Sequence, residues 1–203
     1  MKKTFQLIAM IILFAGCSSS AHIEKSWRDP EVTVDMAKLN KVLVMALLKN
    51  ETNRRLAEDQ LVAMLKGKGV ASYNYFATGI PDDKENETKQ KLKDDGFDGA
   101  IVMRLADVDK DVKYVPGSFN SFPVYYGRFW GYYRNSWNNY YQPGYYENTK
   151  KYTVETNVYS LKRDKLVWSG ITTTVDPQNA EHLMQGVSAT IFKQMKKEKF
   201  IVN

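Results

Sequence analysis

KVLVMALLKNETNRRLAEDQLVAMLKGKG, residues 41–69, contains the clearest structural signal in the chain. Residues 41–48 are a nearly continuous apolar run, which is typical of a strand buried on both faces of a sheet. In residues 53–66 apolar side chains recur at helical spacing, and charged side chains, including Glu58, occupy the other side. The recurring apolar residues are Ala57, Leu61, Met64 and Leu65. Gly67 follows them, so we predict a buried strand and then an amphipathic helix.

The middle of the chain has weaker patterns. A second strand is expected near residues 70–76, and the charged segment 84–95 predicts a mostly solvated helix whose one large apolar residue is Leu92. Residues 100–103 predict a third buried strand, which continues with alternating character towards Val112. Together with the first strand and helix, these segments predict alternating strands and helices along the chain.

The last third of the chain changes to a period of two. Apolar and polar residues alternate in residues 151–161 and 165–175, which predicts a β-hairpin with one face on the core. Trp168 is expected to pack under this part of the sheet. Asp176 and Pro177 then predict the start of a final helix, as a cap and a first helical residue. One face of that helix carries Leu183, Val187 and Ile191.

The predicted element order is β-α-β-α-β-insert-β-β-α. It defines an α/β fold, a mixed β-sheet with helices packed against it. A chain of 203 residues can bury one substantial core. We predict a signal peptide at residues 1–16, a lipidated tether at 17–40 and a single α/β domain at 41–203. A Tyr/Gly-rich insert interrupts this domain at about residues 113–148.

The N-terminus, MKKTFQLIAMIILFAGCSSS, has the features of a secretory signal. Two lysines precede an apolar run at residues 7–15, which is too short to span a bilayer. Residues 14–17, FAGC, resemble the lipobox of bacterial lipoproteins, although Phe14 stands where leucine is usual. In that motif, cleavage precedes a cysteine that carries diacylglycerol. The resemblance implies that Cys17 becomes the first residue and is lipidated.

Cys17 is the only cysteine, so the mature chain can form no internal disulfide. Several acyl chains, palmitate among them, hold a protein firmly to a membrane because each buried methylene contributes about 0.8 kcal/mol. Ser18 follows the cysteine in place of aspartate, and the sorting rule of Gram-negative lipoproteins then implies the outer membrane. We predict a lipid-anchored protein on the periplasmic face, with surface display as the alternative.

The charge of the chain argues against a nucleic-acid partner. Loss of residues 1–16 removes two of the 29 basic side chains and leaves 27 against 23 acidic ones, a net charge of +4. No stripe of Lys and Arg that could follow phosphates is visible. The turn after the first strand, residues 49–54, contains no glycine, which excludes dinucleotide and P-loop binding.

Candidate metal and catalytic groups are few. Asp107, Asp109 and Asp111 resemble the start of a calcium loop, but Val112 and Ser118 stand where glycine and glutamate are required. We expect the three carboxylates to share one face of a strand. The two histidines have no second His or Cys nearby. We therefore expect no metal, no cofactor and no enzymatic activity; an envelope hydrolase that uses converged acidic residues is the alternative.

The insert is rich in aromatic side chains. From Tyr114 to Tyr146 it contains fourteen aromatic residues, two arginines and no carboxylate. It is interpreted as a self-packed hairpin or loop, as a surface for protein contact, or as a segment that touches lipid headgroups or sugar rings. These interpretations overlap. The candidate contact residues are Tyr125, Tyr126, Phe129, Trp130, Tyr132, Tyr133, Trp137, Tyr140 and Tyr141.

Several segments together resemble an uncharacterised family of bacterial lipoproteins. They are SWRDP at 26–30, KVLVMAL and NRRLAED within 41–59, YVPG at 114–117 and VETNVYSLKRDKLVWSGITTTVDP at 154–177. More remotely, the arrangement is similar to the α/β domain of the amino-terminal part of TolB, the curli-secretion lipoprotein CsgG and the lipoprotein activators of cell-wall synthases. Those proteins bind or assemble with partners, so the resemblance implies a similar role and transfers no active-site residue.

The sequence thus predicts a non-catalytic binding or assembly module of the cell envelope. Its membrane contact is the lipid anchor at Cys17, and its candidate contact surface for an envelope protein or glycan is the aromatic insert. An oligomer-forming structural lipoprotein is a further hypothesis, which keeps a homo-oligomer open.

Overall fold

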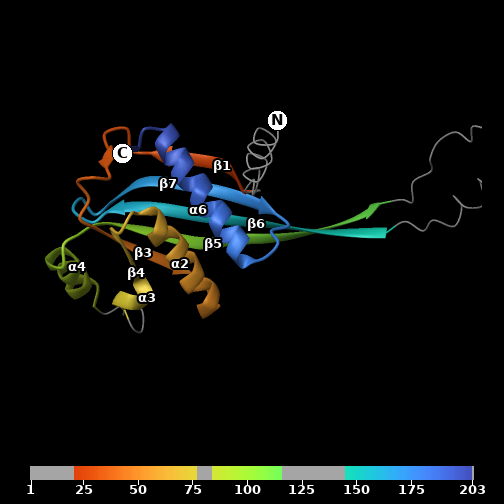
Figure 1. Ribbon diagram of the computed structural model, residues 1–203, viewed down its shortest axis with the longest axis horizontal. Coiled ribbons are helices and arrows are strands. Elements are labelled where there is room, and N and C mark those ends of the chain that lie inside the picture. The colour runs from red at the N-terminus through yellow and green to blue at the C-terminus, as the bar shows by residue number, and fades with distance from the viewer. Residues whose placement is uncertain (1–20, 77–83, 116–144, 203) are drawn as a thin grey trace, which may run out of the picture. The chain divides into compact units, whose positions relative to one another are not determined.

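The computed structural model describes residues 21–76, 84–115 and 145–202 (Figure 1). In chain order these residues form β1 (Ala21–Arg28), β2 (Val34–Asp35), β3 (Lys41–Leu47), α2 (Glu51–Met64), β4 (Gly69–Ala71), α3 (Ser72–Tyr75), α4 (Glu85–Asp94), β5 (Phe97–Val115), β6 (Tyr145–Ser160), β7 (Lys165–Val175), α6 (Ala180–Lys197) and β8 (Ile201–Val202). Within the described residues, six strands form one sheet in the order β1-β7-β6-β5-β3-β4, and β2 pairs with β8. The predicted α/β fold with a mixed sheet is confirmed.

The chain divides into two compact units. Unit 1 consists of residues 1–107 and 152–203, and unit 2 consists of residues 108–151. The described helices and most of the sheet belong to unit 1. In unit 2 the described residues are the outer parts of β5 and β6, which are neighbours in the sheet.

β3 lies inside the sheet, between β4 and β5, and runs parallel to both. Val44 is wholly buried in the main core, whereas its neighbour Leu43 packs in a second, smaller core. Successive side chains of a strand point to opposite faces, so the continuous apolar run serves both cores. The strand predicted at 41–48 is therefore confirmed as β3.

α2 begins after Asn50, whose side chain accepts a hydrogen bond from the Asn53 N–H at 2.9 Å. Gly67 follows the helix with a left-handed φ of 84°, a conformation that glycine adopts without steric cost. The predicted apolar face is buried at Ala57, Leu61 and Leu65. Two residues depart from the prediction, because Met64 is exposed and Glu58, expected on the charged side, is wholly buried.

α2 and α6 pack against each other and cover one face of the sheet in unit 1 (Figure 1). The main core lies between these helices and the strands. On the opposite face α4 contributes Leu92 to the smaller core, so the helix predicted at 84–95 buries its one large apolar residue. The members of the smaller core are Leu43, Leu92, Phe97 and Ala100.

The strand predicted at 70–76 is shorter than expected. β4 ends at Ala71, and the chain turns at once into the short helix α3. The Glu58 carboxylate accepts hydrogen bonds from the Ser72 hydroxyl and the Tyr73 N–H at this point. These bonds occupy donors at the start of α3, and a single sequence gives no sign of this distant acceptor.

β6 and β7 form the predicted hairpin, and Trp168 is wholly buried beneath it. The final helix, α6, begins later than predicted. Asn179 is its N-cap, since its side chain accepts a hydrogen bond from the His182 N–H at 2.9 Å. Asp176 has a left-handed φ of 43°, whereas an N-cap residue needs extended backbone, so the start predicted at Asp176 and Pro177 is wrong. The buried face is as predicted, with Leu183, Val187 and Ile191.

β1 is an edge strand within the segment that was predicted to be a tether. It pairs antiparallel with β7, beginning with Ala21 opposite Thr174. β2 belongs to the same segment and pairs parallel with β8, next to the main core. The folded domain therefore begins earlier than residue 41. Among the described residues no helix is long and apolar enough to cross a membrane.

Candidate functional site

The predicted lipidation site and contact surface lie outside the described residues. This applies to Cys17 and to all nine candidate contact residues between Tyr125 and Tyr141. The neighbouring strands are described, with β5 ending at Val115 and β6 beginning at Tyr145. Tyr145 and Tyr146 expose 62% and 68% of their surface, so the described end of the insert, within unit 2, already presents aromatic surface.

In unit 1, the start of β1, which follows the anchor segment, and the point where β6 enters from unit 2 lie at the same end of the sheet. Ala21 begins β1 and lies opposite Thr174, near the end of β7. β6 and β7 are joined by the turn at 161–164, so the end of β7 lies beside the point where β6 enters unit 1, at Tyr152. Cys17 precedes Ala21 by four residues. Ala21 and Tyr152 therefore lie at the same end of the sheet in unit 1.

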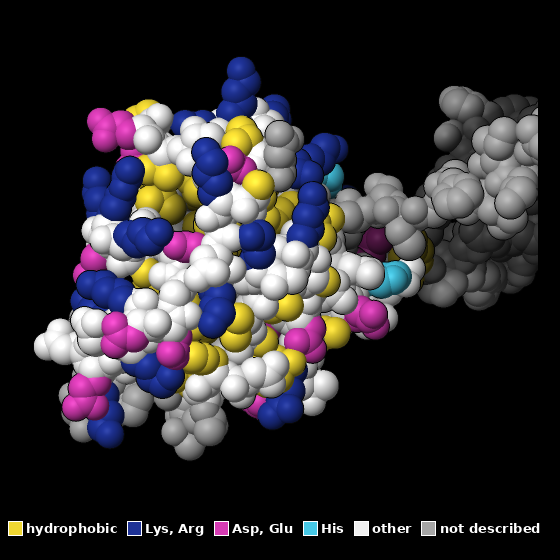
Figure 2. All heavy atoms as spheres, turned by 60° about the vertical axis from the view of Figure 1, so that its left-hand side comes forward, with side chains coloured by type: hydrophobic (Ala, Val, Ile, Leu, Met, Phe, Trp, Pro, Cys, Tyr) yellow, Lys and Arg dark blue, Asp and Glu magenta, His cyan; other side chains and the backbone are white. Residues whose placement is uncertain are grey.

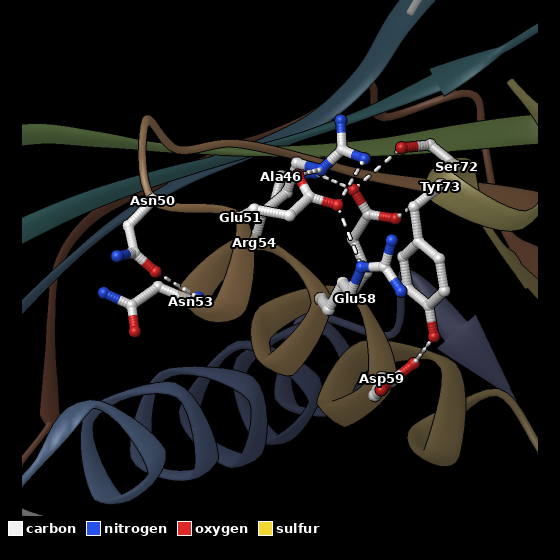
Figure 3. Close-up of polar contacts among 10 residues, drawn as sticks. Ala46, Asn50, Glu51, Asn53, Arg54, Glu58, Asp59, Ser72 and Tyr73 are labelled. Atoms are coloured by element: carbon white, nitrogen blue, oxygen red, sulfur yellow. Dashed lines mark hydrogen bonds and ion pairs between the residues drawn. The ribbon is translucent and has the colours of Figure 1, made fainter. Parts of the chain in front are cut away.

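Glu58 is a wholly buried carboxylate that joins three elements (Figure 3). Its Oε1 atom accepts hydrogen bonds from the Ala46 N–H at 3.0 Å and the Ser72 hydroxyl at 2.7 Å. Its Oε2 atom accepts one from the Tyr73 N–H at 3.2 Å. Ala46 lies beyond the last paired residues of β3 and β4, so Glu58 serves a donor that the short strand β4 does not reach. All its partners are donors from this protein, which assigns Glu58 a structural role.

Tyr73 continues this cluster towards the surface of α2 (Figure 3). Its hydroxyl donates to Asp59 Oδ1 at 2.6 Å, and the Arg55 guanidinium lies 4.8 Å from the centre of its ring. The hydrogen bond to Asp59 raises the pKa of the Tyr73 phenol, and burial raises this pKa further. The phenol therefore stays protonated and acts as a hydrogen-bond donor.

Glu198 fixes β1 to the end of α6. Its carboxylate accepts hydrogen bonds from Ser26, from Trp168 Nε1 at 2.7 Å and from Gln194 Nε2 at 2.7 Å. Burial acts to raise the pKa of Glu198, but the hydrogen bonds from Ser26, Trp168 and Gln194 outweigh it, and the pKa is lowered. Arg28 Nη1 donates to the Glu198 carbonyl oxygen as well. The charged carboxylate is thus occupied by structural partners.

The other candidate carboxylates and the histidines lie on separate elements in the described part of the chain. Asp107, Asp109 and Asp111 alternate along β5 with exposed side chains, on one side of the strand as expected. His22 is on β1 and His182 is in the first turn of α6. Within residues 21–76, 84–115 and 145–202, no three His, Cys, Asp or Glu side chains are placed to hold a metal ion.

Two carboxylates with several structural hydrogen bonds, the buried Glu58 and the partly buried Glu198, were missed from the sequence. Glu58 follows two arginines on a helix and has the pattern of a solvated charge, and Glu198 lies among lysines. Their positions depend on partners from other elements, such as Ser72 for Glu58 and Ser26 for Glu198. No spacing within one helix reveals such partners.

No protein-family model and no curated protein matches this chain. Solved structures match at low similarity. A variant of the PelC dodecamer from Paraburkholderia phytofirmans has 7% sequence identity and a TM-score of 0.42, over 82% of this chain and 94% of that chain. Another structure of the PelC dodecamer has 7% identity and a TM-score of 0.41, over 90% and 99%. The lipoprotein GNA1162 from Neisseria meningitidis has 7% identity and a TM-score of 0.39, over 78% and 99%.

The structural neighbours thus include a bacterial lipoprotein and a dodecameric protein. Sequence identities of 7% and TM-scores below 0.5 say nothing about what this chain binds or how it assembles. Functional inference must therefore start from the residues of this chain.

Proposed function

We propose that this protein is a lipid-anchored lipoprotein of the outer membrane that acts as a non-catalytic binding or assembly module. Its anchor is the acylated Cys17, and it faces the periplasm. Its contact surface is the aromatic insert, which presents Tyr126, Trp130 and Trp137 among other rings to a protein or glycan of the envelope.

One observation carries this proposal: the segments that lead to Cys17 and to the insert leave unit 1 at the same end of the sheet. Ala21 marks this end for the anchor, and Tyr152 marks it for the insert. An anchored chain therefore has the start of β1, four residues after Cys17, and the point where the insert joins unit 1 at the same end of the sheet.

The chemistry of the insert supports contact with a partner. Tyrosine and tryptophan combine a large apolar area with a polar tip, so they bind well where water is only partly excluded. Tyr145 and Tyr146 already show this exposure in the described part of unit 2. An aromatic ring also stacks on the apolar face of a sugar, so the insert is suited to a glycan as well.

The charged groups support a role without catalysis. The wholly buried Glu58 and the partly buried Glu198 are each occupied by donors from the elements that they hold together. A general acid or base needs a proton position that a substrate can reach. Both carboxylates instead have structural partners, which favours a binding module over the alternative hydrolase.

The test is photo-crosslinking in living cells, with a photoreactive amino acid at Trp130 and, as a matched control, at the exposed Glu87 of α4. We expect a discrete crosslinked product from position 130 that is absent from position 87. A second chain that lacks residues 118–144 should keep its folded domain, as shown by an unchanged unfolding midpoint, and lose partner co-purification. Equal co-purification with and without the insert would refute its role as the contact surface.

A further inference from the structure

A cavity of about 380 Å³ lies in unit 1, at the end of the sheet opposite to Ala21 and Tyr152. Its walls come from the beginnings of β5 and β7, the end of β6, the last turns of α6 and the segment 32–39. Side chains that face it include Val34, Leu39, Ile101, Val158, Val167 and Phe192. Its volume falls within the range of small-molecule sites, roughly 300–1,000 Å³.

The interior of this cavity is apolar. Its deep wall consists of buried side chains such as Ile101, Val167 and Met195, which belong to the main core. Five buried side-chain polar atoms in the described residues lack a hydrogen-bond partner, and none belongs to a residue that lines the cavity. A buried water needs two to four polar partners, so this interior suits an apolar occupant better than water.

The charged residues that line the cavity form two ion pairs, and the lysine of each pair is exposed to solvent. Lys162 Nζ lies 2.8 Å from Asp98 Oδ1, and Lys38 Nζ lies 3.5 Å from Asp35 Oδ2. The two lysine side chains expose 75% and 85% of their surface. In Figure 2, where the left-hand side of Figure 1 comes forward, hydrophobic side chains are visible among Lys and Arg side chains. The exposed ammonium groups of Lys38 and Lys162 therefore lie beside the apolar interior of the cavity.

Asp98 is held more firmly than the lysines. Burial acts to raise its pKa, but the hydrogen bond from Lys162 and the backbone bond from Asn40 outweigh it, and the pKa of Asp98 is lowered. Asp98 therefore stays charged and keeps Lys162 near the cavity. The exposed ammonium of Lys162 has three donors, so it can hold Asp98 and an anionic ligand at the same time.

The segment 32–39 covers the cavity and is attached by few backbone bonds. The Val34 N–H donates to the Phe200 carbonyl at 2.7 Å, and the Met36 N–H donates to the Val202 carbonyl at 3.1 Å. β2 and β8 pair over only two residues each. Because this pairing is short, the segment separates from β8 at lower cost than a long strand would, which gives a ligand a route to the interior.

We propose that this cavity binds one aliphatic chain of an anionic single-chain amphiphile, with a fatty acid as the simplest case. The carboxylate lies among Lys38 and Lys162, and the chain occupies the apolar interior. A methylene group takes up about as much space as a water molecule, about 30 Å³, so the cavity holds a chain of about twelve carbons. A ligand with two long chains exceeds this volume. The proposal does not depend on the function of the insert.

The test is binding of dodecanoic acid to the full chain with Cys17→Ser, which has no acyl group of its own at that position. Calorimetric titration should give one site, and the ligand should raise the unfolding temperature in proportion to its occupancy. Hexanoic acid, with the same head and half the chain, should bind at least about tenfold more weakly, because each lost methylene removes apolar burial. Absence of dodecanoate binding, or equal affinity for hexanoate, would overturn the proposal.

Two variants separate the chain from the head group. Val158→Phe should fill the cavity and weaken dodecanoate about tenfold or more; Leu39→Phe, on the covering segment, provides the same test should Val158→Phe not fold. The double change of Lys38→Gln and Lys162→Gln should weaken dodecanoate and leave dodecanol unaffected. Lys165→Gln is the matched control, since Lys165 is an exposed lysine of the same hairpin outside the cavity lining. Wild-type affinity in a folded cavity-filling variant would refute the site, and wild-type affinity in the double variant would refute the anionic head.

Discussion

Replacing Glu58 by alanine should strongly destabilise unit 1. The change removes the acceptor of the Ala46 N–H and of the Ser72 hydroxyl, which it holds at 3.0 and 2.7 Å, and both bonds are buried. A buried donor without a partner costs about 1–3 kcal/mol. The two donors together predict a loss of about 2–6 kcal/mol in the free energy of unfolding. This is a large part of the stability of an ordinary domain, about 5–15 kcal/mol.

Glu58→Gln is the milder variant and tests the same reasoning without a cavity. Its amide keeps one oxygen acceptor, but its NH₂ group then faces a donor, either the Tyr73 N–H or the pair of Ala46 and Ser72. We expect a loss of about 1–3 kcal/mol. Urea unfolding of the Cys17→Ser chain measures both variants, and an unchanged slope shows that only the stability has changed.

The matched control is Glu51→Gln, because Glu51 is an exposed carboxylate on the same helix that pairs with Arg54 and Arg55. It should shift the unfolding midpoint far less than Glu58→Gln, since exposed ion pairs contribute little. If Glu58→Ala costs less than about 1 kcal/mol, the hydrogen bonds of Glu58 do not hold α2, β3 and α3 together as described.

Three further predictions concern Glu198, α6 and the buried Trp168. The folded pKa of Glu198 lies below its ordinary value of 4.5, so its stabilising effect is complete above that value and is lost as the pH falls through the folded pKa. Urea unfolding of wild type and Glu198→Gln should therefore differ at neutral pH and converge in acid; an equal difference at both would contradict this. Asn179→Ala should lower the free energy of unfolding by about 1 kcal/mol in thermal denaturation, and an unchanged value would place the cap elsewhere. Gly170→Ala puts a methyl carbon 2.2 Å from Trp168 Cη2, so it should cost about 1–3 kcal/mol and alter tryptophan fluorescence; unchanged stability and spectrum would show that the sheet can adjust.

The parts of the fold that the sequence predicts are those with a strong local pattern. β3 is evident because both of its faces are buried, and the hairpin of β6 and β7 is evident because one face is. The helix faces of α2 and α6 follow from the spacing of residues such as Leu61 and Val187. In each case the period of the apolar residues matches the geometry of the element.

The parts that were missed depend on partners distant in the chain. β1 contains Lys25, Ser26 and Arg28, and it becomes a strand because the edge of β7 offers hydrogen bonds. The start of α6 is set by the backbone conformation at Asp176, which the local sequence of cap and proline does not show.

The candidate sites divide in the same way. Cys17 was predicted from a local motif and the insert from its composition, so neither prediction required knowledge of the fold. The cavity lined by residues 32–39 could not be found in this way, because its walls meet only after seven elements and their connections have packed. Its one visible signal, apolar residues between lysines, is too common in sequences to indicate a site.

The most direct test of the central claim is the mass of the mature protein extracted with detergent from the membranes of a Gram-negative bacterium. The account predicts a chain that begins at Cys17 and carries the added mass of acyl groups, together with a Cys17→Ser chain that carries none. A mature protein that begins at another residue, or one without acyl mass, would contradict the lipid anchor on which the proposed function rests.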